Sequence, residues 1–419
     1  MLFYAISKGF ANYARLYYVK IHPHLKISFK KHPKAFLISL SAIVVIVFSG
    51  IFFVYFVKSQ ILQNKVAILT AQEKEVKNKL SMAEKELETL KTEDQYVINQ
   101  ELKERIKNIE TTYKKAVASY ENLLDLKTVS KDTAKFDELF AESMDLLAGQ
   151  NYASANAKLT TLTQQIETEQ SKITAAFTIP TNVPSSNTPP SSGYSRQTVN
   201  TDIGSFLISI ISADLNSTRV IVDTASDSDC SDNCPVLPLA DYVARNGAFA
   251  GVNGSYFCPS DYPSCAGKTN SFDTLLMNKN KTYFNSENNK YSSVPLIYFS
   301  GNSAGVRGQS LEWGRDTGID AVLANQGLLL SGGNIMFGGD GDPKKGSKGG
   351  RSFVGNKGNI AYIGVVHNAT VAESAHALKA LGLENALNLD NGGSTALWSG
   401  GYKVGPGRNL PNAVLFVRK

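Results

Sequence analysis

The sequence has 419 residues, 42% of them hydrophobic and 19% charged, so it is long enough for several domains and a sizeable core. The formal net charge is +6, and the basic residues gather at one end. Residues 1–34 contain seven Lys or Arg and no acid, and the first acidic residue is Glu73. This asymmetry favours a membrane as the partner and argues against nucleic acid.

Residues 35–57 form an uncharged stretch of 23 residues. At a helical rise of about 1.5 Å per residue, this stretch can cross a hydrocarbon core of about 30 Å. We predict a transmembrane helix in the lipid bilayer, with residues 1–34 as a basic cytoplasmic tail and the rest of the chain exported. The protein would then be a single-pass type II protein of the cell membrane. A cleaved signal peptide is the alternative, but Tyr55-Phe-Val-Lys58 stands where small residues should follow.

Residues 58–177 are predicted to form a helical stalk. From Leu62 to Val97 apolar residues alternate in steps of 4 and 3, and the pattern resumes from Ile98 after a slip of one residue. Such spacing predicts a coiled coil and hence self-association. Two positions of this pattern, Glu73 and Asp94, are acidic, so a helical hairpin packed on itself remains the alternative.

A second helical pattern spans residues 133–174 and turns at Gly149-Gln-Asn-Tyr152. One such helix pair cannot bury its own apolar face, so we expect it to pack against the stalk. Residues 178–198 follow, rich in Pro, Ser and Thr, with four prolines among them. This composition predicts an extended linker without a core.

Residues 199–419 consist of short apolar runs bounded by Gly, Asn and Asp, which predict strands. Two helices are expected, from Leu239 to Arg245 and from Thr370 to Leu381, the second ending at Gly382. Many strands and few helices indicate one α+β domain. The predicted strands are 205–211, 218–223, 248–252, 296–299, 321–324, 359–366 and 413–417.

All four cysteines lie in this last domain. Four thiolates are a zinc ligand set, but neither pair has the usual two-residue spacing and the domain is expected outside the cytoplasm. Disulfides are therefore favoured over a metal site. Of the three pairings that four cysteines allow, we predict the two local ones, Cys230 with Cys234 and Cys258 with Cys265.

Four motifs in this domain occur in an order that resembles the phosphodiester glycosidase family, over residues 200–419. They are Gly251-Val-Asn-Gly-Ser-Tyr-Phe257, Gly350-Arg-Ser-Phe-Val-Gly355, Ala386-Leu-Asn-Leu-Asp-Asn-Gly-Gly-Ser-Thr395 and Arg408 before the terminal strand. The family usually has three glycines after the aspartate, and here Asn391 replaces the first. Asparagine tolerates left-handed backbone, so we expect the turn to survive.

The resemblance implies hydrolysis of a glycosyl phosphodiester, whose phosphate leaves without protonation. Such a site needs cations for the phosphate, a carboxylate for water or for the sugar, and hydrogen bonds to sugar hydroxyls. Arg351 and Arg408 are the expected cations, and Asp390 is the expected base or electrostatic stabiliser. The predicted substrate contacts are Asn253, Gly254, Gly392, Gly393, Ser394 and Thr395. No cofactor is expected, and a cation such as calcium has only the fragment Asp340-Gly-Asp342 in its favour.

Each assignment has a structural rival. Asp390 would serve equally as a turn cap, and Arg408 as the partner of a surface acid. The basic loop Lys344–Lys348 before Arg351 is either a solvated loop or a lid over the phosphate. His367, at the end of a strand, is interpreted as a structural histidine.

The sequence therefore predicts a membrane-anchored exported hydrolase that cleaves a sugar-1-phosphate linkage in cell-surface or extracellular glycan. Two alternatives belong to other classes. In the first, the C-terminal domain binds polysaccharide without turnover. In the second, the protein is a scaffold of the cell envelope and its coiled coil recruits partners.

Overall fold

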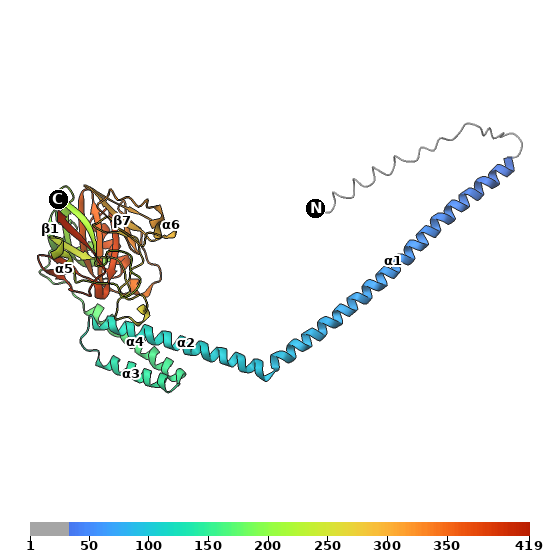
Figure 1. Ribbon diagram of the computed structural model, residues 1–419, viewed down its shortest axis with the longest axis horizontal. Helices are drawn as coiled ribbons and strands as arrows, with labels where there is room; N and C mark the ends of the chain where they lie inside the picture. Colours follow the sequence, from blue (N-terminus) through green and yellow to red (C-terminus); the bar gives the residue numbers. More distant parts are fainter. Residues whose placement is uncertain (1–32) are drawn as a thin grey trace. The chain divides into compact units, whose positions relative to one another are not determined.

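A computed structural model describes the backbone of residues 33–419 and the side chains of residues 41–93 and 95–419. The predicted cytoplasmic tail, residues 1–34, lies outside the described residues except for its last two. The chain divides into two units, residues 1–102 and 103–419. Figure 1 shows the long helix of the first unit and the strand-rich domain of the second.

Helix α1 (Pro33–Thr92) contains the predicted membrane span and the first part of the predicted stalk without interruption. Among the described residues it is the one helix long and apolar enough to cross a membrane. A break at Glu93 separates it from α2 (Asp94–Lys127), a few residues before the slip in the heptad pattern.

Helices α2, α3 (Ala134–Ala148) and α4 (Tyr152–Ala176) share one apolar core in the second unit. The predicted helix pair is thus present, and the Asn151 side chain caps α4 by accepting a bond from the Ser154 N–H at 3.2 Å. Residues 103–177 of the predicted stalk belong to the same unit as the C-terminal domain. The core residues are Ala116, Leu123, Leu126, Phe136, Leu147, Ala155, Leu159, Leu162 and Ile166.

The segment predicted as a linker, residues 178–198, ends inside strand β1 (Gly193–Thr201), so its boundary was placed too late. The residues before the strand also follow it closely. Gln197, which is buried, donates to the carbonyls of Ser186 and Thr188 at 2.7 and 2.9 Å. A polar strand such as Gly193–Thr201 lacks the apolar run that marks a strand in sequence.

Three antiparallel sheets form the C-terminal domain. The first has seven strands in the order β1, β2 (Gly204–Asp214), β13 (Ile360–Ala369), β12 (Gly349–Lys357), β14 (Asn385–Asn391), β10 (Leu328–Ser331) and β11 (Asn334–Ile335). The second has β16 (Tyr402–Val404), β15 (Leu397–Ser399), β4 (Ala250–Asn253), β17 (Asn412–Arg418) and β3 (Thr218–Thr224). The third has β6 (Tyr283–Phe284), β5 (Leu276–Met277), β9 (Ala321–Ala324), β7 (Leu296–Ser300) and β8 (Ser303–Arg307). All seven predicted strands are present, as β2, β3, β4, β7, β9, β13 and β17.

The three sheets meet in one core, to which Ile211 of β2, Val252 of β4 and Leu323 of β9 all belong. The two predicted helices cover outer faces. Helix α8 (Val371–Ala380) packs on the seven-stranded sheet, and α5 (Leu239–Arg245) packs on the second sheet. Thr370 and Glu373 form a capping box at the start of α8, and Gly382 has the left-handed φ of +76° after its end.

The cysteines pair locally, as predicted. Cys230 is bonded to Cys234, and Cys258 is bonded to Cys265. The second disulfide closes a loop that contains Asp261 and Tyr262.

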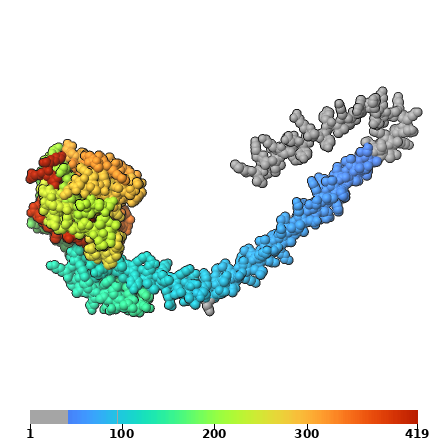
Figure 2. Space-filling model, viewed as in Figure 1, coloured from blue at the N-terminus to red at the C-terminus, as the bar shows by residue number. Residues whose placement is uncertain are grey.

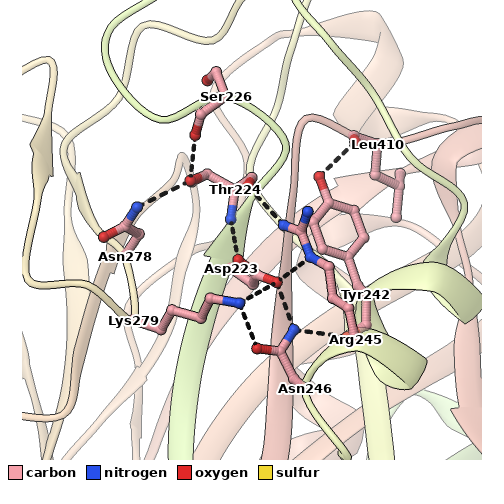
Figure 3. A network of polar contacts seen from close by, with 9 residues as sticks. All are labelled: Asp223, Thr224, Ser226, Tyr242, Arg245, Asn246, Asn278, Lys279 and Leu410. Carbon is pink, nitrogen blue, oxygen red and sulfur yellow. Dashed lines mark hydrogen bonds and ion pairs between the residues drawn. The ribbon is translucent and has the colours of Figure 1, made fainter.

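A buried carboxylate, Asp223 at the end of β3, is surrounded by donors (Figure 3). Its Oδ2 accepts from Arg245 Nε at 2.6 Å and from Lys279 Nζ at 3.3 Å, and also from the Asn246 amide. Its Oδ1 accepts from the Thr224 N–H at 3.0 Å. These bonds join β3 to the end of α5 and to the turn at Lys279. The network was not predicted, because its members are far apart in sequence.

Candidate active site

Asp390 lies near the end of β14, directly before a glycine turn. Leu387 and Leu389 of this strand are buried in the central core and fix the strand end from which Asp390 projects. A 3-10 turn, Gly392–Ser394, follows at once. Gly392 has a φ of +61°, a conformation that favours glycine, so the turn depends on this residue.

Asn391 does not take the left-handed conformation that we expected, since its φ is −126°. The positive φ falls on Gly392 instead. The Asn391 side chain is used for bonding. It accepts from the Ser352 N–H at 3.1 Å and donates to Tyr256 Oη at 3.0 Å. The missing glycine is therefore replaced by a residue that ties the turn to β12 and to Tyr256.

The Asp390 side chain is half-buried. Desolvation by burial raises the pKa of Asp390 to about 7. The Ser394 side chain, the Asn391 N–H and the charges of Arg408 and Lys344 act in the opposite direction and lower this pKa. The Asn391 N–H donates to Asp390 Oδ1 at 2.8 Å. A carboxyl with a pKa near 7 changes its proton readily at neutral pH, as a general acid or base does.

Arg408 lies against the glycine turn. Its N–H donates to the Gly393 carbonyl at 2.8 Å, and a Cβ at Gly393 would come within 2.9 Å of the guanidinium. Only glycine at 393 leaves room for this contact. Nε and Nη2 of Arg408 donate to Asp261 Oδ2 at 3.3 and 3.2 Å. Arg408 is thus paired with an acid, but it lies beside the glycine turn that follows Asp390.

Lys344 is the second cation near Asp390, and an aromatic ring connects it with Arg408. Lys344 Nζ lies 4.4 Å from the centroid of the Tyr262 ring, and Arg408 Cζ lies 4.9 Å from the same centroid. Tyr262 comes from the loop closed by the Cys258–Cys265 disulfide. It covers the two positive groups that act on Asp390.

Arg351 differs from the forked phosphate ligand that we expected. It is 4% exposed, and its Nε donates to the Ala369 carbonyl at 2.8 Å. Its Nη2 donates to the carbonyls of Lys344 and Ser347. The guanidinium therefore fastens the Lys344–Lys348 loop to the end of β13. The loop is not freely solvated, since it contains the short helix α7 (Pro343–Gly346) and the buried Lys345.

We expect Arg351→Met to release this loop and to destabilise the domain by about 1 to 3 kcal/mol, because the buried Ala369 carbonyl loses its partner. Limited trypsin digestion should then cut at Lys344 or Lys348 faster than in the wild type. Arg219→Met, at an exposed site on β3, is the control and should change neither the unfolding midpoint nor the cleavage. Equal cleavage in both variants would refute the anchoring role.

Asn253 and Gly254 lie beside Asp390 but face into the protein. Asn253 is 0% exposed; its Nδ2 donates to the Asp390 carbonyl at 2.7 Å and its Oδ1 accepts from Ser352 Oγ at 2.7 Å. The Gly254 carbonyl accepts from the Asp390 N–H at 2.9 Å, and a Cβ at Gly254 would lie 1.8 Å from the Asn412 side chain. Both residues position Asp390 through its backbone rather than through its carboxyl.

The remaining predicted contacts belong to the turn. Ser394 is buried and its side chain lowers the pKa of Asp390, whereas Thr395 donates to the Gly350 carbonyl at 3.3 Å. Gly392 is exposed and Gly393 half-buried. The structure thus brings Asp390, Arg408 and the glycine turn together. Asn253 and Gly254 hold the backbone of Asp390, and Arg351 holds the loop that carries Lys344.

Helix α2 also reaches this site. Asp125 accepts a bond from Tyr262 Oη and lies 3.7 Å from Arg408 Nη2, and Glu121 accepts from the Ser264 N–H at 3.0 Å. Figure 2 shows the yellow part of the C-terminal domain, which contains this loop, against the cyan helix. The sequence contains no signal for these long-range contacts. Two sequence features could have identified the other site residues. Tyr262 lies between the paired cysteines Cys258 and Cys265, and Lys344 lies in the basic loop before Arg351.

Two other sequence candidates have structural roles. His367 Nε2 bonds Ser209 Oγ at 2.9 Å, and desolvation together with Arg196 lowers the pKa of His367 to about 4, so it is neutral at pH 7. Asp342 caps α7 by accepting from the Lys344 N–H at 2.8 Å, and Asp340 pairs with Lys345. The Asp340–Asp342 segment is therefore a turn.

The raised pKa of Asp390 predicts two pH effects of opposite sign. If the carboxylate is the active form, kcat/KM rises through pH 7 and levels off above it. Because the folded pKa is above the unfolded value of about 3.9, the stability contribution is present at low pH and is lost as pH rises from 4 to 7. Urea midpoints measured over this range should fall in the wild type relative to Asp390→Asn. If the urea midpoints of the two proteins change in parallel with pH, the pKa of Asp390 is not raised in the folded protein.

Comparison with known proteins supports the motif-based resemblance. The sequence model of the phosphodiester glycosidase family matches residues 246–417. No match was found among curated proteins.

Three solved structures of low identity are similar to parts of this chain. A hypothetical protein from Synechocystis is 12% identical to this chain, with a TM-score of 0.38. The alignment covers 54% of this chain and 62% of that protein, so this chain spans less than two thirds of its length. A second structure is the catalytic domain of zebrafish N-acetylglucosamine-1-phosphodiester alpha-N-acetylglucosaminidase, auto-inhibited by its pro-peptide. It is 15% identical, with a TM-score of 0.42, and the alignment covers 57% of this chain and 87% of that domain. A protein of Burkholderia pseudomallei is 10% identical with a TM-score of 0.34, covering 51% and 74%.

The family match contains Asn253, Arg351, Asp390 and Arg408 together with the turn that joins them. Residues 246–417 therefore match the phosphodiester glycosidase family model across the whole candidate site.

Proposed function

We propose that this protein is a membrane-anchored, exported hydrolase that cleaves a glycosyl phosphodiester of cell-surface or extracellular glycan. The observation that carries the proposal is the Asp390 carboxyl, with a pKa of about 7, beside the cations Arg408 and Lys344. The family supports the reaction class. Anchoring and the glycan substrate rest on the sequence.

The bond to be broken joins the anomeric carbon to a phosphate oxygen. As carboxylate, Asp390 takes a proton from water while the water oxygen bonds the anomeric carbon. The electron pair of the broken bond stays on the phosphate, which leaves as a monoester and needs no proton from the enzyme. The proton on Asp390 then passes to solvent, which restores the carboxylate.

Positive charge is required where the phosphate leaves. Arg408 offers planar donors and Lys344 a compact charge, and both already act on Asp390. A phosphate would replace Asp261 on Arg408, since the Asp261 side chain is 45% exposed and can be solvated by water instead. Arg351 contributes indirectly, by holding the loop that carries Lys344. Within the turn, the exposed Gly392 and the half-buried Gly393 are the proposed sugar contacts.

Tyr256 adds a hydrogen-bond donor to this arrangement. Its hydroxyl oxygen accepts from Asn388 Nδ2 at 2.7 Å and from Asn391 Nδ2 at 3.0 Å, so its proton is available to a third group. Burial and the nearby Asp390 charge raise the pKa of Tyr256, which keeps the phenol protonated. We propose that it donates to a substrate oxygen next to Asp390.

We expect Tyr256→Phe to lower kcat/KM about 10- to 100-fold, the value of one lost hydrogen bond in the transition state. Tyr291→Phe, an exposed tyrosine, is the matched control and should leave the rate unchanged. Unchanged kinetics in Tyr256→Phe would remove it from the mechanism.

Anchoring and export are supported by three features. The uncharged stretch 35–57 lies in a helix long enough to span a bilayer, and it follows a basic segment. Two disulfides are typical of a domain outside the cytoplasm. We propose a single-pass type II topology, with the C-terminal domain outside.

The test is release of reducing sugar from UDP-N-acetylglucosamine and from a synthetic sugar phosphodiester. The fragment should contain residues 103–419, because helix α2 contacts the site. We expect turnover by the wild type. Binding of surface polysaccharide without turnover of any phosphodiester would instead support a binding protein.

A further inference from the structure

Helix α1 carries an apolar stripe beyond the predicted membrane span that the structure leaves exposed. We call these residues the stalk seam. Leu62, Leu69 and Leu80 are 65%, 63% and 58% exposed, and Leu90 is 48% exposed. Exposed leucines at heptad spacing on one helical face are stabilised when a second helix covers them. The stalk seam comprises Leu62, Val66, Leu69, Val76, Leu80, Ala83, Leu87 and Leu90.

The seam has the a and d pattern of a parallel two-stranded coiled coil. Val66, Leu80 and Leu87 fall at a, and Leu62, Leu69, Val76, Ala83 and Leu90 fall at d. Over these residues the α1 backbone is one unbroken helix, so the stripe is continuous. The helical hairpin is not formed here, because α1 does not turn before Glu93.

Charges beside the seam show which partner fits. In a parallel dimer each g residue meets the e residue five positions later in the other chain. Lys79 then meets Glu84, and Glu86 meets Lys91, so each pair combines opposite charges. The two earlier pairs, Lys65 with Thr70 and Gln72 with Lys77, bring no like charges together. A second copy of the same helix is therefore complementary to the first.

Glu73 is the one charged residue at an a position between Leu62 and Leu90. Its carboxylate pairs with Lys77 of the same helix at 2.9 Å, which offsets the repulsion between two facing copies. A single polar residue at a costs a coiled coil stability. Glu73 would thus weaken the dimer, and the register rests on the paired charges beside the seam.

We propose that two copies of this chain associate through the stalk seam as a parallel, in-register coiled coil. Parallel pairing also agrees with the proposed membrane anchor, which would insert both copies from the same end. The inference does not depend on the enzymatic function.

Site-directed crosslinking of the full-length chain in detergent tests this proposal. Single cysteines would be introduced at two d positions, Leu69→Cys and Leu90→Cys, and at two positions on the opposite face, Asn78→Cys and Lys85→Cys. The four native cysteines are all disulfide-bonded and leave no competing thiol. After mild oxidation we expect disulfide-linked dimers at both d positions, at least about 10-fold more than at either control position.

Three outcomes would overturn the proposal. Equal crosslinking on both faces would indicate random collision, and crosslinking at one d position alone would indicate antiparallel pairing. Absence of dimers at both would exclude the seam as an interface. As a second measurement, Leu80→Asp with Leu87→Asp should convert the dimer to monomer in light scattering, while thermal unfolding of residues 103–419 stays unchanged.

Discussion

Replacing Asp390 by asparagine is expected to lower kcat/KM for glycosyl phosphodiester hydrolysis by about 10²- to 10⁴-fold, the usual contribution of a general base. The fold should be retained, because the bonds from Asn253 and Gly254 reach the backbone of residue 390 and not its carboxyl. Asparagine also keeps the oxygen that accepts from the Asn391 N–H. The loss would therefore report on chemistry and not on structure.

Two variants make this result specific. Asp241→Asn changes an exposed carboxyl on α5 and should leave the rate unchanged. Ser394→Ala removes a bond that lowers the pKa of Asp390, so the midpoint of the pH–rate curve should move upward. Activity in Asp390→Asn within a few-fold of wild type would show that another group performs the proton transfer.

Removing the Asp223 carboxylate is expected to give the largest loss of stability. Asp223 is 2% exposed and faces Arg245 and Lys279, which are 35% and 30% exposed. Breaking a buried ion pair costs about 3 to 5 kcal/mol, and the partial exposure of both cations places the cost of Asp223→Ala at about 3 kcal/mol. Urea unfolding of residues 103–419 measures this difference.

The matched control for Asp223→Ala is Asp241→Ala, an exposed acid on the neighbouring helix α5 that should cost less than about 0.5 kcal/mol. Asp223→Asn should fall between the two, since it keeps an acceptor for the Thr224 N–H but loses the charge. A loss in Asp223→Ala no larger than in the control would mean that the network in Figure 3 contributes no stability.

Local signals predicted a large part of the fold. Apolar runs marked strands such as β2 and β17, and the Thr370 cap with Gly382 marked both ends of α8. Strands β1 and β12 were not predicted, because their sequences are polar and glycine-rich and depend on pairing with β2 and β13. The place of residues 103–177 with the C-terminal domain depends on contacts that no local pattern encodes.

The candidate site shows the same division. Asp390 and the glycine turn are consecutive in sequence, so a motif could identify them together. The partners that surround Arg408 come from the disulfide loop and helix α2, which only the folded chain brings near. The roles expected for Arg351 and Asn253 differ in the structure for a related reason. Burial and bonding, which the sequence does not specify, give them positioning roles.

The most direct test of the proposed reaction is hydrolysis of a sugar phosphodiester by residues 103–419 in water labelled with heavy oxygen. Attack on the anomeric carbon, with Asp390 as base, places the label in the hydroxyl of the released sugar and none in the phosphate monoester. Mass spectrometry of both products reads the position of the label. Label in the phosphate would mean cleavage of the phosphorus–oxygen bond and would contradict the glycosidase mechanism, as would the absence of turnover.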